Sequence, residues 1–427
     1  MKTLVCTVLV SLAPAAWLPG ATAEEQGLEA GFTRPPDSAK PWVFWVWSGG
    51  WSKEGATADL EAMKRVGIHG VCIMGAPPTL TLQWRENFKY AVSEMARLGM
   101  ELDMYNGPGW SGSGGSWITP DKASQKVVWT ETNVEGPRRL EDVLKQPEGF
   151  LWPPRPRGAQ TQPGQESHYH DIAVLAFPTP DGVNPIPRIK EKAVFECCYC
   201  SGFGAMKPAL IAPPGKFPAM EPGKMIQPDR LLDLTTQMNK DDRLVWDVPA
   251  GKWTVLRLGY RPTGALVSPT GAGLECDKFS KEALDVHFQA LMAQLIADAG
   301  PLAGDGKTLV ATHIDSWEAG PQNWSALFRE EFRRRRGYDP LRFLPILTGR
   351  VVDTPDVSER FLWDFRQTIS DLIVENYAGH MRKLARQHGL RLSIEGYDGT
   401  PCDDMTYAGR ADVPMLSFGG RRPRTLR

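Results

Sequence analysis

Residues 42–47 read WVFWVW, and two further short apolar runs follow them, IHGVCIM at 68–74 and MELDMY at 100–105. Between these runs, over 52–66 and 84–97, apolar residues recur at the spacing of an amphipathic helix. Strands that alternate with amphipathic helices are typical of βαβ units, whose strands pair in parallel. This part of the chain therefore predicts the beginning of a parallel sheet covered by helices.

The pattern changes over residues 130–273, where helical spacing disappears and turn residues separate short β-like segments at 172–177, 243–248 and 253–260. Residues 247–253 have the composition of a turn between two strands. We therefore predict a β-rich domain inserted into the helical and parallel part.

The βα pattern resumes near residue 280 and supplies further strands, for a total of about six. The predicted elements are a helix that carries Leu284, Phe288, Leu291 and Leu295, a strand at 308–315, a helix at 323–336, a long helix from Ser358 to Gly389, and strands at 390–395 and 412–415. The expected fold is α/β, a (β/α)8-type (TIM-like) barrel that is incomplete and carries the inserted β-rich domain.

The expected division of the chain follows from these patterns. It consists of a signal peptide at 1–23, the first βα units of the barrel at 24–129, the β-rich insertion at 130–273, the continuation of the barrel at 274–415, and an aberrant Arg-rich tail at 416–427.

The composition excludes several classes of partner. The chain has 427 residues, 42% of them hydrophobic, with 49 Lys and Arg against 50 Asp and Glu, so it lacks the basic surplus that nucleic acids and anionic membranes attract. After the N-terminal leader, we find no apolar run long enough to span a membrane. The 15 Trp against 9 Tyr favour a carbohydrate as partner, because indole rings stack on sugars.

Residues 1–23 have the features of a secretory signal. Lys2 supplies positive charge, residues 4–18 are mostly apolar, and Ala21-Thr22-Ala23 resembles a cleavage site. We therefore expect cleavage after Ala23 and a secreted or periplasmic protein.

The cysteines predict neither a disulfide framework nor, from their spacing, a zinc site. Six remain after the leader is removed, few for so long a chain. The cluster Cys197-Cys198-Tyr199-Cys200 has no second Cys or His pair at zinc spacing.

Side chains that follow the predicted strands are the candidates for a site, because the carboxyl ends of barrel strands surround the active site. Trp47 ends the first strand, and Asn106 and Trp110 follow the third. Indoles beside hydrogen-bonding groups suit a sugar ring, so these residues are candidate substrate ligands. The alternative is that the indoles only fill the mouth of the barrel.

Carboxylates follow two later strands. Asp315, Trp317 and Glu318 come after the strand at 308–315, and Glu395, Tyr397 and Asp398 come with the strand at 390–395. Glycoside hydrolysis needs one protonated carboxyl group and one carboxylate, so Glu318, Glu395 and Asp315 are the candidate catalytic residues. Trp317, Tyr397 and Asp398 join the candidate substrate ligands. The alternative for each acid is a salt bridge, for example to Arg366 or Arg410.

Several stretches of the chain, spread over about residues 40–418, resemble glycoside hydrolase family 106, the α-L-rhamnosidases. The stretches are 41–47 with 53–55, 106–111, 315–318, 335–339 and 411–415. The resemblance implies a secreted bacterial enzyme with a (β/α)8-like catalytic domain, β-sandwich domains, an inverting mechanism and often calcium near the site. It implies that Glu318 is the general acid and that Asp315 binds substrate or tunes Glu318.

The general base that the resemblance implies falls at Ser417, where this chain departs from the family pattern. Loss of one base after the Met415 codon would turn Met-Ala-Glu-Phe-Trp into the Met-Leu-Ser-Phe-Gly found at 415–419. Our hypothesis is therefore a frameshift or truncation near residue 416. Glu395 remains a candidate base or sugar ligand from its position after a strand.

The expected function is the hydrolysis of terminal α-L-rhamnosyl residues, with a rhamnosylated glycan or glycoside as substrate. The sequence requires no cofactor, and calcium enters only through the resemblance; no pattern identifies metal ligands. The alternatives are a carbohydrate-binding protein without turnover, an inactive fragment that lacks its base, and another barrel glycosidase such as a galactosidase.

Overall fold

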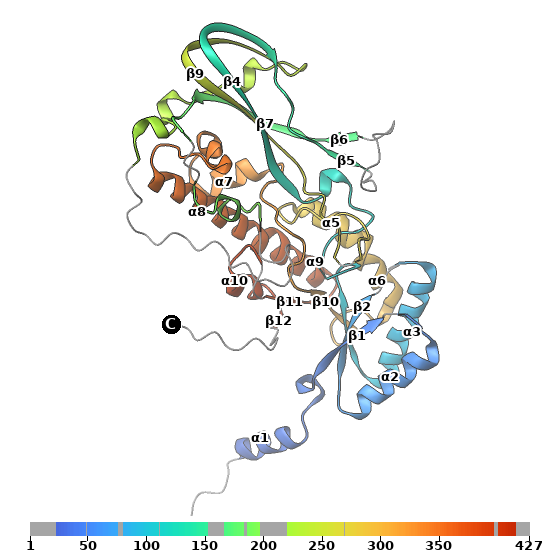
Figure 1. Ribbon diagram of the computed structural model, residues 1–427. Coiled ribbons are helices and arrows are strands. Elements are labelled where there is room, and N and C mark those ends of the chain that lie inside the picture. The colour runs from blue at the N-terminus through green and yellow to red at the C-terminus, as the bar shows by residue number, and fades with distance from the viewer. Residues whose placement is uncertain are drawn as a thin grey trace, which may run out of the picture.

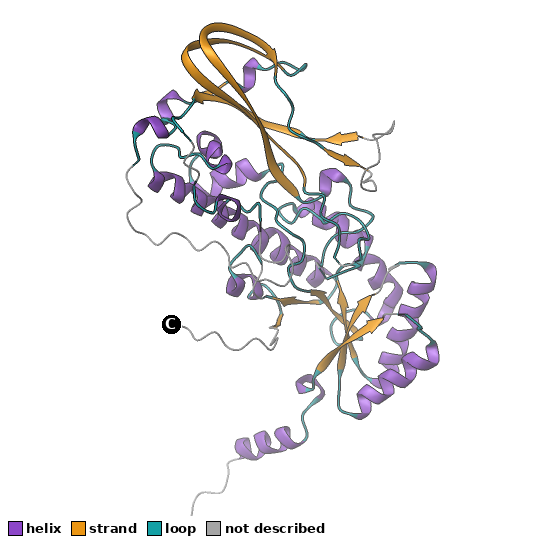
Figure 2. Ribbon diagram, viewed as in Figure 1, coloured by secondary structure: helices purple, strands orange, loops and turns teal. Residues whose placement is uncertain are grey.

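The computed structural model describes residues 23–47, 49–75, 80–110, 112–152, 166–182, 186–196, 220–268, 270–396 and 400–415. The expected signal sequence up to Thr22, the Cys197–Cys200 cluster, Tyr397, Asp398 and Ser417 lie outside these residues. Figures 1 and 2 show a parallel sheet with helices at its side, and a separate antiparallel sheet at the other end of the molecule.

Six strands form the parallel sheet, as the sequence predicts, in the order β1-β2-β3-β10-β11-β12. Their bounds are β1 Trp42–Trp47, β2 Gly70–Gly75, β3 Glu101–Tyr105, β10 Leu309–Ile314, β11 Arg391–Glu395 and β12 Val413–Met415. Every neighbouring pair is parallel. The sheet curls into a half-barrel, and the described residues do not close it into an eight-stranded barrel.

Helices lie at each place where the sequence predicts one, but the structure divides two of the predicted helices and adds further short ones. They are α2 Lys53–Arg65, α3 Leu82–Leu98, α5 Lys281–Ala290, α6 Met292–Ala299, α7 Phe328–Arg336, α8 Pro355–Leu372, α9 His380–Gln387 and α10 Asp404–Ala408, with α1 Ala23–Thr33 before β1 and α4 Ile189–Lys192 in the insertion. Helix α3 packs on β3, α6 on β10 and α9 on β11.

Short helical turns connect these elements. The 3-10 turns are η1 Asp37–Ala39, η2 Pro120–Lys122, η3 Pro222–Lys224, η4 Pro228–Arg230, η5 Thr235–Gln237, η6 Gly300–Leu302 and η7 Pro340–Thr348, and the π-helical turn η8 Ile373–Gly379 joins α8 to α9. The single helix expected over Leu284 to Leu295 is divided into α5 and α6 at Leu291, whose ψ of −74° departs from ideal helix geometry.

Helix ends follow the capping chemistry of the sequence. The Ser52 side chain accepts a hydrogen bond from the backbone N–H of Gly55 and so caps α2. Gly99 ends α3 in the left-handed conformation, with a φ of +60° that favours glycine. These caps fix where the chain begins α2 after β1 and where it leaves α3 for β3.

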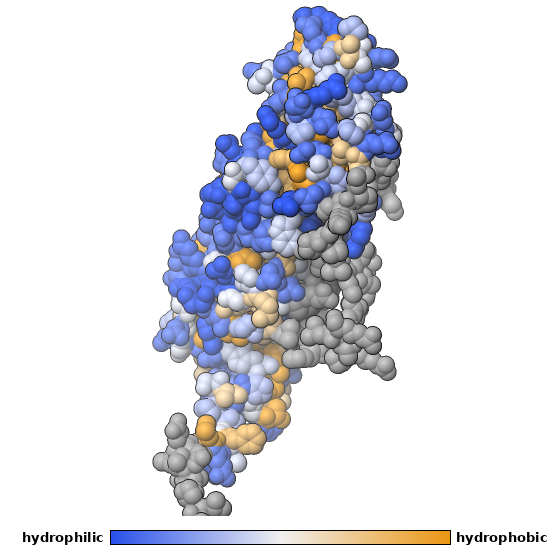
Figure 3. All heavy atoms as spheres, turned by 90° about the vertical axis from the view of Figure 1, so that its left-hand side faces the viewer, coloured by the Kyte–Doolittle hydropathy of each residue, from blue (hydrophilic) through white to orange (hydrophobic). Residues whose placement is uncertain are grey.

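Side chains of β1 alternate between the two faces of the sheet. Trp45 and Trp47 are buried on the helix side, whereas Phe44 and Val46 are exposed on the inner face of the half-barrel. The Phe44 ring lies 5.9 Å from that of His313, which marks the inner face on β10 too. The outer face supplies the main hydrophobic core, together with the apolar sides of the helices. The part of the surface drawn in Figure 3 is mainly hydrophilic, with scattered hydrophobic patches.

The insertion forms an antiparallel sheet in the order β4-β9-β7-β8, with a separate pair β5-β6. The bounds are β4 Gln125–Val143, β5 Phe150–Trp152, β6 Glu166–His168, β7 His170–Pro178, β8 Leu232–Asp233 and β9 Arg243–Pro262. The ladder therefore begins before the expected domain start at residue 130 and ends before residue 273.

The turn predicted at residues 247–253 was wrong. These residues lie within one long strand, β9, which pairs with β4 along most of its length. The register shifts between Gly136 and Arg138 of β4, opposite this segment, and Gly251 has a φ of +104°. A bulge and a glycine thus accommodate the turn-like residues inside a ladder.

A buried guanidinium ties the strands of the insertion together. Arg257 of β9 is 1% exposed and donates hydrogen bonds of 2.8 Å to both oxygens of Asp171 and one of 2.7 Å to Asp242. It also donates to the backbone oxygen of Leu144. One cation therefore satisfies acceptors from three separate segments.

The Arg257→Met variant should lower the free energy of unfolding by about 2 kcal/mol, because methionine keeps the aliphatic contacts but leaves two carboxylates without their partner. Urea denaturation followed by circular dichroism measures the loss. Arg138→Met, which removes a more exposed pair with Asp142 at 3.6 Å, serves as the control and should have little effect. Equal losses in the two variants would contradict the role given to Arg257.

Candidate functional site

Polar residues occupy the inner face of the half-barrel. Parallel pairing aligns Tyr105 with His313 and His313 with Ser393, so these side chains from β3, β10 and β11 point to one side. Asp103 and Glu395 lie two residues away from this row on their strands and share the same face. Barrel interiors are usually filled by branched apolar side chains, so this polar interior marks a candidate site.

Asp315 lies directly after β10 and is held by two donors. The Tyr105 hydroxyl donates to Oδ2 at 2.5 Å, and the backbone N–H of Ser316 donates to Oδ1 at 2.7 Å. Asp315 is 8% exposed. Burial, followed by the Asp315 charge, raises the pKa of the Tyr105 hydroxyl, so Tyr105 remains a donor. The structure thus fixes one carboxylate at the end of β10.

Glu318 lies three residues further along and is half-buried. The Ser268 hydroxyl donates to Oε2 at 3.0 Å and the Ser316 hydroxyl donates to Oε1 at 3.3 Å. Burial raises the pKa of the Glu318 carboxyl group; the two serine hydroxyls oppose this shift, and the Asp315 charge adds to it. A carboxyl group that keeps its proton nearer to neutral pH is what a general acid requires.

Trp317 lies between Asp315 and Glu318 in the sequence, and its side chain is buried. Its Nε1 donates to the Gly320 oxygen at 3.1 Å, and the Lys278 ammonium lies 5.2 Å from the centre of its ring. Lys278 in turn forms a buried ion pair of 2.9 Å with Glu275. Trp317 was expected to contact the sugar; the structure places it where it supports the loop that carries Glu318.

Glu395 ends β11 and lies beside Asp315. Potential ligand atoms of His313, Asp315 and Glu395 all lie within 4.8 Å of one another. The structure therefore brings together two of the three carboxylates that the sequence suggested. The expected alternative of a salt bridge to Arg366 is not what the structure has, since Arg366 donates to the backbone oxygen of Lys192.

The predicted sugar ligands are distributed over different environments. Trp47 lies on the helix side of β1, with its ring centre 5.5 Å from that of Trp84, so its indole is not placed to stack on a sugar at the inner face. Asn106 is fully buried and donates to the Gly112 oxygen at 3.1 Å, which shapes the glycine-rich loop.

Trp110 is the predicted indole that approaches the site. It is partly exposed, and its backbone N–H donates at 2.8 Å to the oxygen of Ser268, the residue whose hydroxyl contacts Glu318. Tyr397 and Asp398 lie outside the described residues, so their predicted roles stay predictions.

Sequence reasoning did not select Cys72, Asp103, Tyr105 or Ser268. On β3, Asp103 and Tyr105 alternate with apolar residues, and this period of two could have indicated a polar inner face. Ser268 had no such signal, because it lies in the loop that leaves β9 and reaches Glu318 only in the folded chain.

Calcium, which the resemblance implies, prefers six to eight oxygen ligands. The cluster of His313, Asp315 and Glu395 offers an imidazole nitrogen among three donors. Asp315 already accepts hydrogen bonds from Tyr105 and from the Ser316 backbone. This cluster therefore does not fit a calcium ion.

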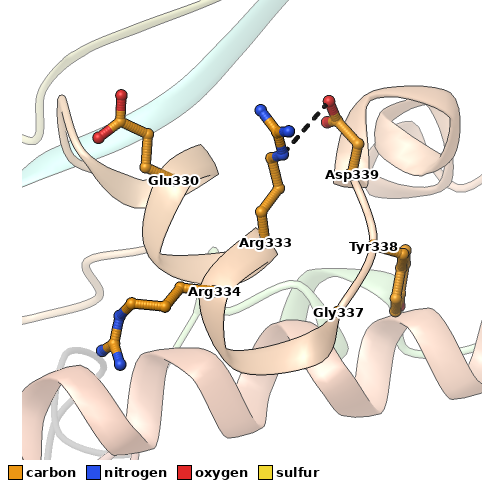
Figure 4. Close-up of a pocket in the computed structure, with 6 residues that line it drawn as sticks. All are labelled: Glu330, Arg333, Arg334, Gly337, Tyr338 and Asp339. Atoms are coloured by element: carbon orange, nitrogen blue, oxygen red, sulfur yellow. Dashed lines mark ion pairs between the residues drawn. The ribbon is translucent and has the colours of Figure 1, made fainter.

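A surface pocket of about 640 Å³ lies elsewhere, beside α7. It is lined by Glu330, Arg333, Arg334, Gly337, Tyr338 and Asp339, which Figure 4 shows around the end of that helix. Asp339 accepts from Arg329 and caps η7, and Tyr338 donates to Asp364. The stretch 335–339, which carries part of the family resemblance, thus has a structural role here.

Comparisons with known proteins agree with this arrangement. The family model described as alpha-L-rhamnosidase, glycoside hydrolase family 106, matches residues 33–423. A solved structure titled as a rhamnosidase from Novosphingobium sp. PP1Y superimposes with a TM-score of 0.71 at 27% identity, over 91% of this chain and 49% of that chain.

A Formosa agariphila protein named "Putative beta-glucuronidase" is 38% identical over 403 residues, which are 92% of this chain and 32% of the relative. The chain thus spans about a third to a half of the lengths of these relatives. The family match extends over most of the chain and includes the β10 segment with its two acids. The chain belongs to glycoside hydrolase family 106, the alpha-L-rhamnosidase family.

Proposed function

We propose that the chain carries the acid-bearing part of a glycosidase that cleaves terminal α-L-rhamnosides with inversion, Glu318 acting as general acid. The observation that carries the proposal is the environment of Glu318, half-buried beside Asp315 with a raised pKa and two orienting serines. The family membership and the rhamnosidase structure support the choice of sugar.

In this mechanism the Glu318 proton passes to the glycosidic oxygen as the bond to the anomeric carbon breaks. Ser268 and Ser316 hold the carboxyl group in place and stabilise the carboxylate that remains. Asp315, fixed by Tyr105 at the end of β10, accepts from a sugar hydroxyl. Inversion needs a second carboxylate on the opposite side of the sugar with room for water, about 6.5–9.5 Å from the acid.

We propose Glu395 as that base or, failing that, as a ligand for a sugar hydroxyl. It projects from the end of the neighbouring strand β11 onto the same face. The position that the resemblance gave to the base, Ser417, lies outside the described residues. If Glu395 is only a ligand, the described part binds sugar without turnover.

β-Glucuronide hydrolysis is the second candidate, favoured by the name of the Formosa relative. A glucuronide carries a carboxylate, whereas rhamnose is uncharged. The carboxylates of Asp315 and Glu395 would repel the glucuronide carboxylate, and Lys278 is already paired with Glu275. The negative charge of these two carboxylates therefore favours an uncharged sugar such as rhamnose.

Export, with a glycan outside the cytoplasm as substrate, is part of the proposal and rests on the leader at residues 1–23. In the described residues, none of the helices has both the length and the apolar character needed to cross a membrane. The mass of the N-terminus in the mature protein from its native host tests whether cleavage occurs after Ala23.

Glu318→Gln should lower kcat by a factor that depends on the leaving group. An alkyl rhamnoside needs its leaving oxygen protonated and should lose about 10²–10⁴-fold, whereas a nitrophenyl rhamnoside, whose leaving group is a weak base, should lose far less. Rhamnose release from both substrates measures the difference. Glu330→Gln, on the surface of α7, is the matched control and should leave both rates unchanged. Equal losses on the two substrates would rule out Glu318 as the acid.

The pH profile should carry the signature of Glu318. Since the protonated form is active, kcat/KM falls as pH rises through the raised pKa, giving the basic limb of the profile. Ser268→Ala removes a hydrogen bond that lowers this pKa, so the limb should move to higher pH. Ser280→Ala, at the cap of α5, should leave the limb in place. A limb that moved downward in Ser268→Ala would contradict the assignment.

A panel of nitrophenyl glycosides separates the sugars. Release from the α-L-rhamnoside should exceed release from the β-D-glucuronide and the β-D-galactoside by at least tenfold. A preference for the glucuronide would replace the first candidate by the second. Isothermal titration with rhamnose tests the binding-only alternative, which predicts heat of binding unaffected by Glu318→Gln and no hydrolysis.

A further inference from the structure

A second group of side chains lies deeper on the inner face than the rim, by which we mean the residues at the ends of β10 and β11 that carry Asp315, Glu318 and Glu395. Cys72 of β2, Asp103 of β3 and His313 of β10 have potential ligand atoms that all lie within 4.8 Å of one another. None of the three is more than 2% exposed. The mechanism proposed above assigns no role to Cys72 or Asp103.

Hydrogen bonding fixes the tautomer of His313. The Ser393 hydroxyl donates its only proton to Asp103 Oδ2 at 2.5 Å, so it accepts from His313 Nδ1–H at 2.7 Å. In the neutral imidazole, Nε2 therefore carries a lone pair.

Two buried acceptors consequently remain without a donor. In the described part of the chain, His313 Nε2 and Asp103 Oδ1 have no hydrogen-bond partner. Leaving such groups unsatisfied is unfavourable, because they lose their hydrogen bonds to water on folding and gain none in return. The Cys72 thiol is a weak donor with one proton and could satisfy only one of them. Both atoms carry lone pairs that a cation can coordinate.

We propose that Cys72, Asp103 and His313 bind one Zn²⁺ ion, which ties strands β2, β3 and β10 together. Thiolate, imidazole and carboxylate are the ligand types that Zn²⁺ takes, at about 2.0–2.3 Å. The three donors lie within 4.8 Å of one another, so side-chain rotation has to bring them closer together when the ion binds. On binding, Cys72 releases its thiol proton to solvent and forms the sulfur–zinc bond, so the ligands contribute two negative charges.

The surroundings stabilise a cation here. The carboxyl groups of Asp103, Asp315 and Glu395 lie close enough to Cys72 to act on it electrostatically, so negative charge surrounds a cation bound there. A divalent cation deprotonates the thiol that it coordinates. Ser393 supplies the outer hydrogen bond that orients a metal-binding histidine. Cysteine spacing in the sequence gave no sign of the site because each ligand comes from a different strand.

The test uses the purified full chain after treatment with a chelator, and needs no substrate. Native mass spectrometry with added Zn²⁺ should show one ion per chain, and Co²⁺ should produce a thiolate-to-cobalt charge-transfer band in the near ultraviolet. Cys72→Ser should abolish the band, whereas Cys402→Ser, which removes a free thiol outside the cluster, should retain it. Circular dichroism verifies that both variants are folded.

Asp103→Asn provides a second variant that keeps the shape of the side chain. It should retain the cobalt band but weaken Zn²⁺ binding at least tenfold, and His313→Ala should weaken it by more. No bound ion in the folded wild-type chain would overturn the proposal. A cobalt band that survives Cys72→Ser, or that is lost in Cys402→Ser, would overturn it as well. These outcomes are independent of glycosidase activity.

Discussion

The parallel pairing of β10 with β3 on one side and with β11 on the other is the constraint on which the candidate site depends. This register aligns Tyr105, His313 and Ser393 and directs their side chains to the inner face. A shift by one residue would turn every one of them toward the helices, because side chains alternate along a strand. The register is held by the apolar residues of the opposite face, which pack under α3, α6 and α9.

The rim and the interior of the half-barrel carry different chemistry. At the rim, Asp315 is fixed by Tyr105, and Glu318 lies where burial favours its protonated form. Below the rim, His313 and Asp103 are linked through Ser393 in a fully buried chain of hydrogen bonds. Rigid support below and partial exposure above are what a site needs if its acid is to stay in one orientation.

The insertion contributes to the site through one loop. After β9, the chain passes through Ser268, which contacts Glu318 with its hydroxyl and Trp110 with its backbone oxygen. The buried ion pairs of Arg257 fix the long β4-β9 ladder from which that loop departs. The antiparallel sheet therefore positions Ser268, which in turn orients Glu318 beside the end of β10 in the parallel sheet.

The sequence by itself determined the local structure and the positions of the acids. Apolar period and capping residues were sufficient for the six parallel strands, and the place of Asp315 and Glu318 after a strand followed from the same pattern. Local patterns report short-range preferences, so they misread residues 247–253 as a turn where cross-strand pairing with β4 prevails. They also selected Trp47, whose side was decided by packing against Trp84. Only the tertiary structure brought Ser268 to Glu318, and Cys72 to Asp103 and His313, because these contacts join segments far apart in the chain.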